Sequence, residues 1–386
     1  MKLGILTLPL GTNYGGLLQA YALRTVLEKM GHEVLIIDIR RPVYELSLLM
    51  KVASFLKRSF SRWVLRRDHV MHPFIPHMTI EDRLLIAKNT NNFIKEHLDR
   101  TEPIYFFDNI YKKIEHYNFD GYIVGSDQVW RPKQTSNIST YFLDFIESQT
   151  HVRKISYAAS FGAAEWEFSK EMTEQCTLLA KKFDSISVRE DSASALCKKY
   201  LDANAVHVLD PTMLLEKKDY IRLLETDTKR VNRRTIFTYI LDESMDKQSV
   251  IDEIATRKGL SPCDALPKHN YRDVGPDGLK ECVIPPVTYW LQGIMDAEYV
   301  VTDSFHGCVF SIIFNKQFIA IGNISRGIAR FTSLLKIFGL EERLIYSCNQ
   351  LTNALIDQDI DYNKVSKLLR QERQASKNYL SKSLTG

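Results

Sequence analysis

A histidine stands in a short turn near the end of the sequence, where an α/β fold could use it for chemistry. The sequence D-S-F-H-G at 303–307 lies between the apolar run 299–302 and a helical pattern over 307–314. A histidine in such a turn can act as a general acid or donate a hydrogen bond to a phosphate. The alternative is that His306 hydrogen-bonds Asp303 in a capping network. The position of His306, rather than its residue type, favours the chemical role.

A second polar cluster, G-S-D-Q-V-W at 125–130, directly follows an apolar strand pattern. Active-site groups of open α/β sheets lie at the carboxyl ends of strands. Asp127 could orient or deprotonate a sugar hydroxyl, Gln128 could bind the same acceptor, and Trp130 could stack on a sugar ring. The alternative is that Asp127 is a helix N-cap and Trp130 belongs to the core.

Two further motifs could hold anions. In S-V-R-E at 187–190, Arg189 ends a strand pattern, and its planar guanidinium could bind a carboxylate or a phosphate through two bonds. The alternative is an ion pair with Glu190 or Asp191. In T-N-Y-G-G at 12–16, Asn13, Gly15 and Gly16 precede a helical pattern, so backbone N–H groups could approach an anion. A plain strand-to-helix turn explains this motif equally well.

No motif in the chain points to a bound cofactor or metal. The turn at 12–16 is neither G-x-G-x-x-G nor a P-loop. The six cysteines are scattered without C-x-x-C spacing, which is typical of reduced thiols in a cytoplasm rather than disulfides or zinc ligands. We therefore expect a cytoplasmic protein with no metal and no cofactor.

Alternating strand and helix patterns position these motifs. Residues 1–8 and 34–39 read as strands around a helix at 17–30, which is a βαβ unit with a parallel sheet. Further strands are predicted at 121–125, 154–159, 185–189 and 206–209, and a second set at 235–240, 299–302 and 318–321. The fold class is α/β, with two Rossmann-like domains facing a central cleft. We predict domains at 1–220 and 230–345, divided by the charged stretch 216–234, and a helical tail at 346–386.

Length, net charge and hydropathy indicate the number of domains and exclude two classes of protein. A chain of 386 residues is too long for one compact core, which agrees with two domains. Its net charge of +4 is too small to indicate a nucleic-acid-binding protein. No run approaches the roughly 20 apolar residues that a membrane-spanning helix needs.

One segment, residues 44–67, is basic and amphipathic. Its apolar residues include Phe60 and Trp63, and it carries six basic residues and no acidic one between Leu46 and Arg67. Such a helix can lie on an anionic bilayer, which would make the protein peripheral at the inner face of the cytoplasmic membrane. The favoured alternative is a helix whose apolar face packs on the domain and whose basic face lies in water.

Six motifs in the same order resemble those of the polysaccharide pyruvyl transferase family. They are the sequences at 12–16, 125–130 and 187–190, with Y-A-A-S-F-G at 157–162, D-P-T at 210–212 and D-S-F-H-G at 303–307. The resemblance runs from residue 1 to about residue 343. It implies a fold like the GT-B glycosyltransferases and transfer of a pyruvyl group from phosphoenolpyruvate to a sugar of a cell-surface glycan.

The resemblance also implies roles for particular residues. Asp127 and His306 match the family's aspartate and histidine, and Arg189 matches its donor-binding arginine. Many relatives have Arg-Leu-His where this chain has Ser304-Phe305-His306. We expect Arg326 or Arg330 to supply the missing guanidinium, with Ser304 at the donor site.

The function implied is ketal formation on a sugar or a lipid-linked oligosaccharide, with phosphoenolpyruvate as co-substrate and phosphate as product. Two alternatives stay open. One is a GT-B glycosyltransferase that uses a nucleotide sugar. The other is a family member that binds a glycan without turnover.

Overall fold

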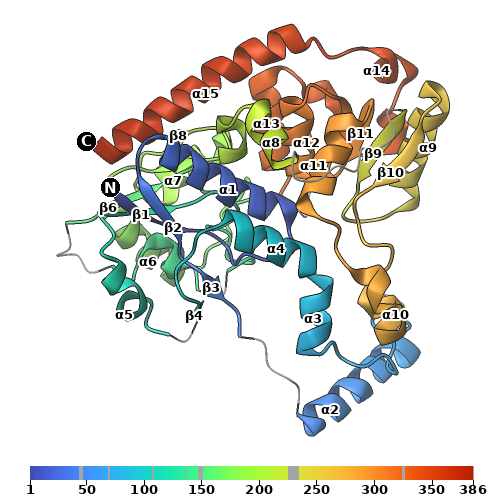
Figure 1. Cartoon of the computed structure of the whole chain (residues 1–386), viewed down its shortest axis with the longest axis horizontal. Helices are drawn as coiled ribbons and strands as arrows, with labels where there is room; N and C mark the ends of the chain where they lie inside the picture. Colours follow the sequence, from blue (N-terminus) through green and yellow to red (C-terminus); the bar gives the residue numbers. More distant parts are fainter. Residues whose placement is uncertain are drawn as a thin grey trace.

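The computed structural model describes residues 1–42, 47–67, 70–106, 108–135, 137–146, 151–224, 234–323 and 327–385. Within these ranges the chain folds into two α/β halves, and a long C-terminal helix lies across both (Figure 1).

The first half is built on a parallel sheet. Strands β1 (Lys2–Leu6), β2 (Glu33–Ile36), β5 (Gly121–Val124) and β6 (Arg153–Ser156) pair in the order β2-β1-β5-β6. A bridge between Ile155 and Ser185 connects β6 to the pair β7 (Ser187–Val188) and β8 (Val206–His207). A small pair, β3 (Ile39–Arg40) and β4 (Ile104–Tyr105), lies beside β2. The carboxyl ends of these strands therefore point to one edge.

The second half has its own parallel sheet, in the order β10-β9-β11-β12-β13. The strands are β9 (Thr235–Tyr239), β10 (Ser261–Asp264), β11 (Tyr299–Thr302), β12 (Gln317–Ile321) and β13 (Leu344–Ile345). The predicted class, α/β with two Rossmann-like halves, is confirmed. The predicted domain boundaries stay predictions: part of the charged stretch forms α8 (Lys217–Leu224), and residues 225–233 lie outside the described ranges.

Helices complete both halves. In the first half they are α1 (Tyr14–Lys29), α2 (Leu48–Ser59), α3 (Ile80–Ile86), α4 (Lys88–His97), α5 (Ile110–Ile114), α6 (Lys170–Ala180) and α7 (Asp191–Tyr200). In the second half they are α9 (Met245–Lys258), α10 (Tyr271–Val274), α11 (Val287–Asp296), α12 (Phe305–Ile313), α13 (Ala329–Phe338) and α14 (Asn353–Asp357). The tail is helical, as predicted, and forms α15 (Tyr362–Thr385). No helix in the described ranges is long and apolar enough to cross a bilayer.

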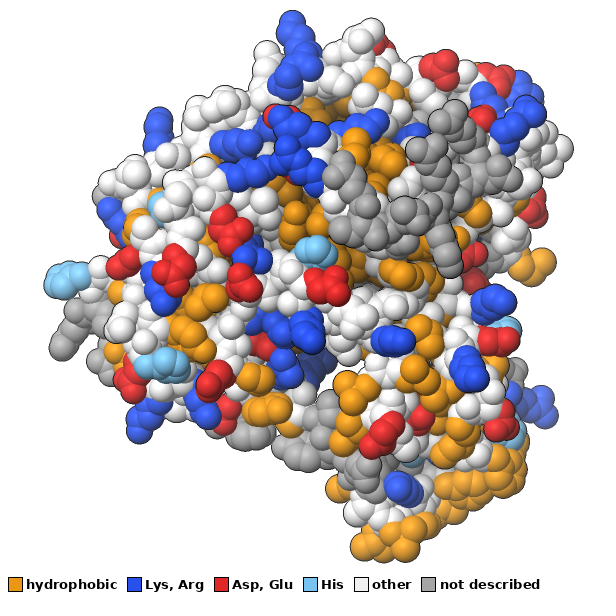
Figure 2. Space-filling model, viewed as in Figure 1, with side chains coloured by type: hydrophobic (Ala, Val, Ile, Leu, Met, Phe, Trp, Pro, Cys, Tyr) orange, Lys and Arg blue, Asp and Glu red, His pale blue; other side chains and the backbone are white. Residues whose placement is uncertain are grey.

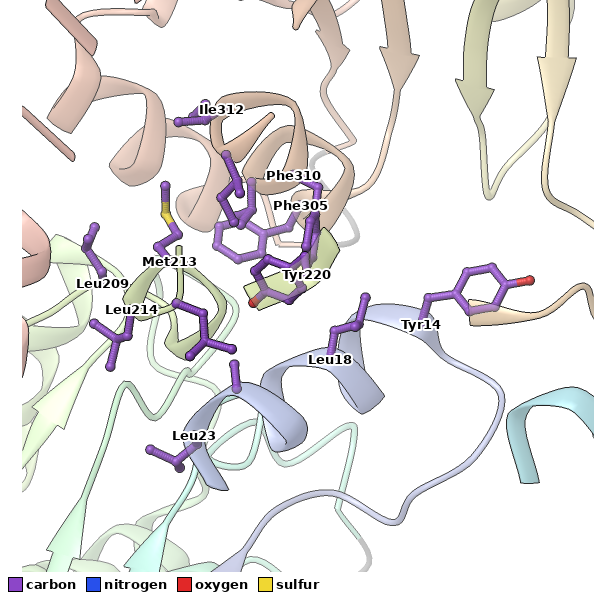
Figure 3. Packing of buried hydrophobic residues seen from close by; sticks show 14 of the residues in the cluster. Tyr14, Leu18, Leu23, Leu209, Met213, Leu214, Tyr220, Phe305, Phe310 and Ile312 are labelled. Carbon is purple, nitrogen blue, oxygen red and sulfur yellow. The ribbon is translucent and has the colours of Figure 1, made fainter. Parts of the chain in front are cut away.

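One hydrophobic cluster joins the two halves. It contains Leu18 of α1, Tyr220 of α8 and Phe310 of α12, whose side chains converge in Figure 3. The rings of Tyr220 and Phe310 meet edge to face, with centroids 4.9 Å apart. Burial of such aromatic side chains is a major stabilising contribution. The shared core therefore holds the first turns of α1 and α12 at fixed positions relative to each other.

Two helices begin earlier than the sequence pattern indicated. Asn13 is the N-cap of α1, and its side chain accepts a hydrogen bond from the N–H of Gly16. Residues 14–16, which we predicted as a loop, are therefore the first helical turn. Similarly, α12 begins at Phe305, so His306 lies within the helix rather than before it. The capping bond of Asn13 sets the start of α1, and the apolar periodicity that we used did not detect the first turn of either helix.

The favoured interpretation of the segment 44–67 is wrong. Its described part forms α2 and a π-helical turn at Phe60–Val64, while residues 44–46 lie outside the described ranges. The apolar side chains of Phe60 and Trp63 are more than half exposed. The inward side instead carries Arg58 and Arg62, which donate to backbone carbonyls of residues 70–75. The backbone carbonyls of residues 70–75 need hydrogen-bond donors, and the two arginines supply them. The helix therefore turns its arginines inward, although hydrophobic burial alone would favour the opposite orientation.

Candidate active site

The predicted site residues of the first half come together at the carboxyl edge of its sheet. Asp127 follows β5 and Arg189 follows β7. Asp210 follows β8 at the start of the turn Pro211–Leu214. From the second half, the first turn of α12 brings His306 to the same place, where its Nε2 lies 3.6 Å from Oδ2 of Asp210. The site is therefore assembled from both halves.

Arg189 and Asp210 form a buried ion pair at the centre of this cluster. Nη1 of Arg189 donates to Oδ2 of Asp210 at 2.8 Å and to Oγ of Ser126 at 3.2 Å. Ser126 Oγ donates in turn to the same carboxylate oxygen at 3.0 Å. The other oxygen, Oδ1, accepts from the backbone N–H and the hydroxyl of Thr212. Both side chains of the pair are about 1% exposed, so the pair is held in a dry, low-dielectric environment.

Charges in the cluster are mutually dependent. Burial alone would raise the pKa of Asp210, but the neighbouring His306 ring and the Arg189 guanidinium outweigh it and hold that pKa well below its usual range. Burial alone would lower the pKa of Arg189, but the carboxylates of Asp210, Asp127 and Glu190 raise it above its usual value. Both groups therefore stay ionised at neutral pH.

His306 is fixed between the two halves. It is 6% exposed, and the Nδ1 side of its ring lies against the first turn of α1. A Cβ at Gly15 would come 2.0 Å from Nδ1, so only glycine allows this approach. Asp303 does not hold the ring. It pairs with Lys247 at 2.7 Å and accepts from the N–H of Leu241. The alternative in which His306 hydrogen-bonds Asp303 in a capping network is therefore wrong.

Several polar atoms of the cluster are buried without a hydrogen-bond partner among the described residues. They are Nε and Nη2 of Arg189 and Nε2 of His306. Buried donors of this kind are rare in folded proteins, because leaving one unsatisfied costs roughly 1–3 kcal/mol. A guanidinium edge with two such nitrogens matches a bound carboxylate or phosphate.

A second arginine lies close by. The guanidinium carbon of Arg330 lies 5.6 Å from the ring centre of Phe305, and that of Arg189 lies 4.8 Å from the same ring. Burial, and then the charge of Arg189, lower the pKa of Arg330 to about 10, so it is still a cation at neutral pH. Ser304, the N-cap of α12, is 8% exposed and makes no side-chain capping bond. Arg326 lies outside the described residues.

Asp127 lies at the edge of the cluster, 3.7 Å from Nη2 of Arg189. Its φ of 94° is in the left-handed region, which costs energy for a residue with a side chain. The carboxylate accepts from the N–H of Gln128. The first turn of α1 is also near, because a Cβ at Gly16 would lie 3.6 Å from Oδ2 of Asp127. The structure thus brings the turn at 12–16 and Asp127 together.

The interpretation of Trp130 as a sugar-stacking residue is wrong. Trp130 is fully buried, stacks on Phe142 with ring centres 4.8 Å apart, and donates from Nε1 to the carbonyl of Tyr141. Its indole therefore belongs to the core, as the alternative held. Gln128 is partly buried and accepts from Arg131 through Oε1, and a Cβ at Gly162 would lie 2.2 Å from that oxygen. Gln128 therefore supports the loop that follows β6.

Sequence reasoning gave two carboxylates no place in the site. Asp210 entered only through the D-P-T motif of the resemblance, although an aspartate directly after an apolar strand was the signal that we used for Asp127. Glu190 is fully buried, and its Oε1 accepts from the N–H groups of Phe161 and Gly162. It shapes the loop after β6 rather than pairing with Arg189 as the alternative proposed.

A hollow of about 620 Å³ opens beside the turn that leads into α1. Its lining includes Gly11 and Thr12, together with Arg40, Arg41 and Arg83. Arg40 is paired with Asp38, at 2.6 Å. No carboxylate is among the residues that line the hollow, so it suits a ligand that carries negative charge.

Comparisons with known proteins agree with the motifs. A family model described as polysaccharide pyruvyl transferase matches residues 13–325. No curated protein matches the chain.

Solved structures with a similar course of the chain include UDP-GlcNAc 2-epimerase from Neisseria meningitidis bound to UDP-GlcNAc. It has 10% identity and a TM-score of 0.49, with 100% of this chain and 99% of that chain covered. Arabidopsis thaliana UGT89C1 complexed with UDP-L-rhamnose has 11% identity and a TM-score of 0.49, with 99% and 97% covered.

Proposed function

Because the chain belongs to the polysaccharide pyruvyl transferase family, we propose that it transfers a pyruvyl group from phosphoenolpyruvate to two hydroxyls of one sugar. The product is a pyruvate ketal, and phosphate is released. The acceptor is a sugar or a lipid-linked oligosaccharide that serves as precursor of a cell-surface polysaccharide.

The observation that carries this proposal is the buried edge of Arg189. Two of its nitrogens, Nε and Nη2, have no hydrogen-bond partner among the described residues, and Arg330 adds a second buried cation beside the ring of Phe305. Phosphoenolpyruvate carries a carboxylate and a phosphate, so it offers one anionic group to each arginine. Binding of the donor would relieve the repulsion between the two guanidiniums. Arg330 thereby supplies the cation that relatives have at the position of Ser304.

His306 is the proposed general acid. It gives a proton to the methylene carbon of the donor, and the first sugar hydroxyl attacks the adjacent carbon, which has become electron-poor. The bond from that carbon to the phosphate oxygen breaks, and the second hydroxyl closes the ring. One of the two hydroxyl protons returns to His306, and the other leaves with the phosphate. The ionised carboxylate of Asp210, 3.6 Å from Nε2 of His306, would balance a positive charge on the ring.

Asp127 is the proposed acceptor-positioning residue. Its carboxylate lies between Arg189 and the first turn of α1, which is where Asn13, Gly15 and Gly16 are found. A sugar hydroxyl that reaches Asp127 would also be next to the donor held by Arg189. We therefore place the acceptor on the side of the 12–16 turn.

The test is release of phosphate from phosphoenolpyruvate with a panel of galactose, mannose and glucose acceptors, free and lipid-linked. We expect release that depends on one acceptor, together with a rise in melting temperature on addition of phosphoenolpyruvate alone. A nucleoside diphosphate that raises the melting temperature while phosphoenolpyruvate does not would favour a nucleotide-sugar transferase. Donor binding and glycan binding without phosphate release under any acceptor would favour the non-catalytic alternative.

A further inference from the structure

Large exposed hydrophobic side chains gather on one projecting part of the molecule. We define the lobe as residues 47–67 and 70–86, which contain α2, the π-helical turn and α3. Of the twenty large hydrophobic side chains that are exposed in the described residues, thirteen belong to the lobe. They are Leu48, Leu49, Met50, Val52, Leu56, Phe60, Trp63, Val64, Leu65, Phe74, Ile80, Leu84 and Leu85. Figure 2 shows this concentration on the lower right projection.

Five apolar residues of α2 and the π-helical turn share one outward stripe. Leu49, Val52, Leu56, Phe60 and Trp63 recur at intervals of three or four residues, and each is between 52% and 83% exposed. Such spacing places them along one stripe of the helix. Ser54 and Arg58 are on the inner side, where Oγ of Ser54 lies 2.8 Å from Nε2 of His77 and Arg58 donates to the carbonyl of Ile75 at 2.9 Å.

The lobe is packed internally by its own aromatic rings, and a backbone hydrogen bond joins its base to the second half. The ring of Phe74 lies 5.6 Å from that of Phe55, centre to centre, and 6.3 Å from that of Trp63. At its base, the N–H of Ile284 donates to the carbonyl of Ile86 at 3.0 Å. Figure 1 shows α2 at the outer end, beyond α3 and α10. The outward apolar face is therefore presented by a structured platform.

Positive charge flanks this face. Lys51, Lys57, Arg66 and Arg67 are exposed, and residues 47–67 include no acidic side chain. If a second copy of the chain docked on this face, the cations of the two copies would lie close together and repel each other. An anionic surface would not repel them, and a bilayer accepts the whole apolar stripe without a shaped partner.

From the exposed stripe and the flanking cations, we propose that α2 and the π-helical turn lie on an anionic lipid bilayer. The apolar stripe enters the boundary between headgroups and acyl chains, with Trp63 at the level that indole rings prefer. Lys51, Lys57, Arg66 and Arg67 contact the anionic headgroups. This attachment is reversible, and added salt weakens it because the charges are exposed.

Co-sedimentation of the full chain with vesicles tests this inference without reference to catalysis. We expect binding to phosphatidylglycerol mixed with phosphatidylcholine at low salt, less binding at high salt, and little binding to phosphatidylcholine alone. The double variant Lys51→Glu/Lys57→Glu should lose at least on the order of thirtyfold in partitioning. Leu49→Ser/Leu56→Ser should reduce binding at low and high salt alike. No hydrogen bond or ion pair of these four side chains is recorded within the described residues, and Lys51 has only a charge repulsion with the ring of His77, so the fold should persist.

Two controls test whether vesicle binding depends on this face in particular or on any exposed charge or apolar side chain. Lys364→Glu/Lys367→Glu changes the same charges on α15, at the opposite end of the molecule in Figure 1, and Leu178→Ser removes an exposed leucine of α6. Both should bind vesicles like the parent chain. The inference is overturned if the lobe variants bind like these controls, or if the parent chain ignores anionic vesicles. It is also overturned if light scattering shows a dimer that Leu49→Ser/Leu56→Ser dissociates, since a second copy would then cover the stripe.

Discussion

At the scale of single residues, His306 is the group on which the proposed proton transfer depends. Its ring is buried between α1 and Asp210, so it is held in place before a substrate arrives. His306→Ala should lower turnover by about a hundred- to ten-thousand-fold, as expected for loss of a general acid. Phosphate release measures the effect, and circular dichroism verifies the fold. The exposed His116 offers a control, since His116→Ala should leave turnover unchanged. Turnover near the parent rate in His306→Ala would exclude this role.

The two buried arginines should contribute unequally to donor binding. Arg189→Ala removes the guanidinium at the centre of the cluster, and it should abolish the rise in melting temperature that phosphoenolpyruvate causes. Arg330→Ala should weaken donor binding less, and Arg326→Ala can be compared with it. Arg189→Lys keeps the charge but not the planar edge, so it should not restore binding. Arg257→Gln, at an exposed ion pair of α9, is the control. Normal donor binding in both Arg330→Ala and Arg326→Ala would exclude compensation for Ser304.

The ion pair of Asp210 makes stability depend on pH in one direction. Its folded pKa is held below the ordinary value of about 4, so its contribution is complete above that value and is lost as the pH falls below it. Asp210→Asn breaks a buried pair and should cost roughly 3–5 kcal/mol near neutral pH. In urea unfolding, the difference in free energy of unfolding between parent and variant should become smaller below about pH 4. A difference that stays constant would contradict the ionised pair.

At the scale of elements, the first turns of α1 and α12 set the geometry of the site. Gly15→Ala would place a methyl group 2.0 Å from Nδ1 of His306, so one of the two helices must shift. We expect a loss of roughly 1–3 kcal/mol in stability and a larger loss in turnover, because the shift displaces His306 from Asp210. Gly11→Ala is the matched control, since a Cβ there meets nothing within 4 Å. Equal behaviour of the two variants would show that the contact is not needed.

The sequence predicted most strands but not how neighbouring elements meet. Continuous apolar runs such as 121–124 and 299–302 identify buried parallel strands on their own. By contrast, β10 contains Pro262 and has no apolar run, so no local signal marks it. The orientation of α2 was predicted wrongly because periodicity shows that a helix has two faces but not which one faces the protein. The orientation depends on hydrogen bonds from Arg58 and Arg62 to backbone carbonyls of residues 70–75, which lie outside the periodic segment.

The candidate site was predicted only in part for a related reason. Asp127, Arg189 and His306 could be proposed because each stands at the end of a strand pattern, where α/β folds place their functional groups. The pairing of Arg189 with Asp210 instead of Glu190 depends on how β7 and β8 lie beside each other, and Trp130 is buried by Phe142. Such tertiary contacts leave no trace in local spacing.

At the scale of the whole molecule, α15 connects the second half back to the first. It starts beside β12, where the N–H of Ile360 donates to Gln317, and it reaches the turn after β8. There, Oγ of Ser376 accepts from the N–H of Leu209 at 3.0 Å, and Nε of Arg373 donates to the carbonyl of Met213 at 2.6 Å. Because Asp210 is the N-cap of this turn, the helix supports an element of the candidate site.

The last prediction concerns Leu380, a fully buried residue near the end of this helix. Leu380→Ala leaves a cavity under α15 and should cost roughly 2–5 kcal/mol. Since one core joins the two halves, we expect unfolding to stay a single transition at lower temperature, with turnover at low temperature reduced only modestly. Calorimetry of the full chain measures both the midpoint and the number of transitions. Lys367→Ala, on the exposed side of the same helix, should unfold like the parent. Two separate transitions in Leu380→Ala would mean that α15, rather than the shared core, couples the two halves.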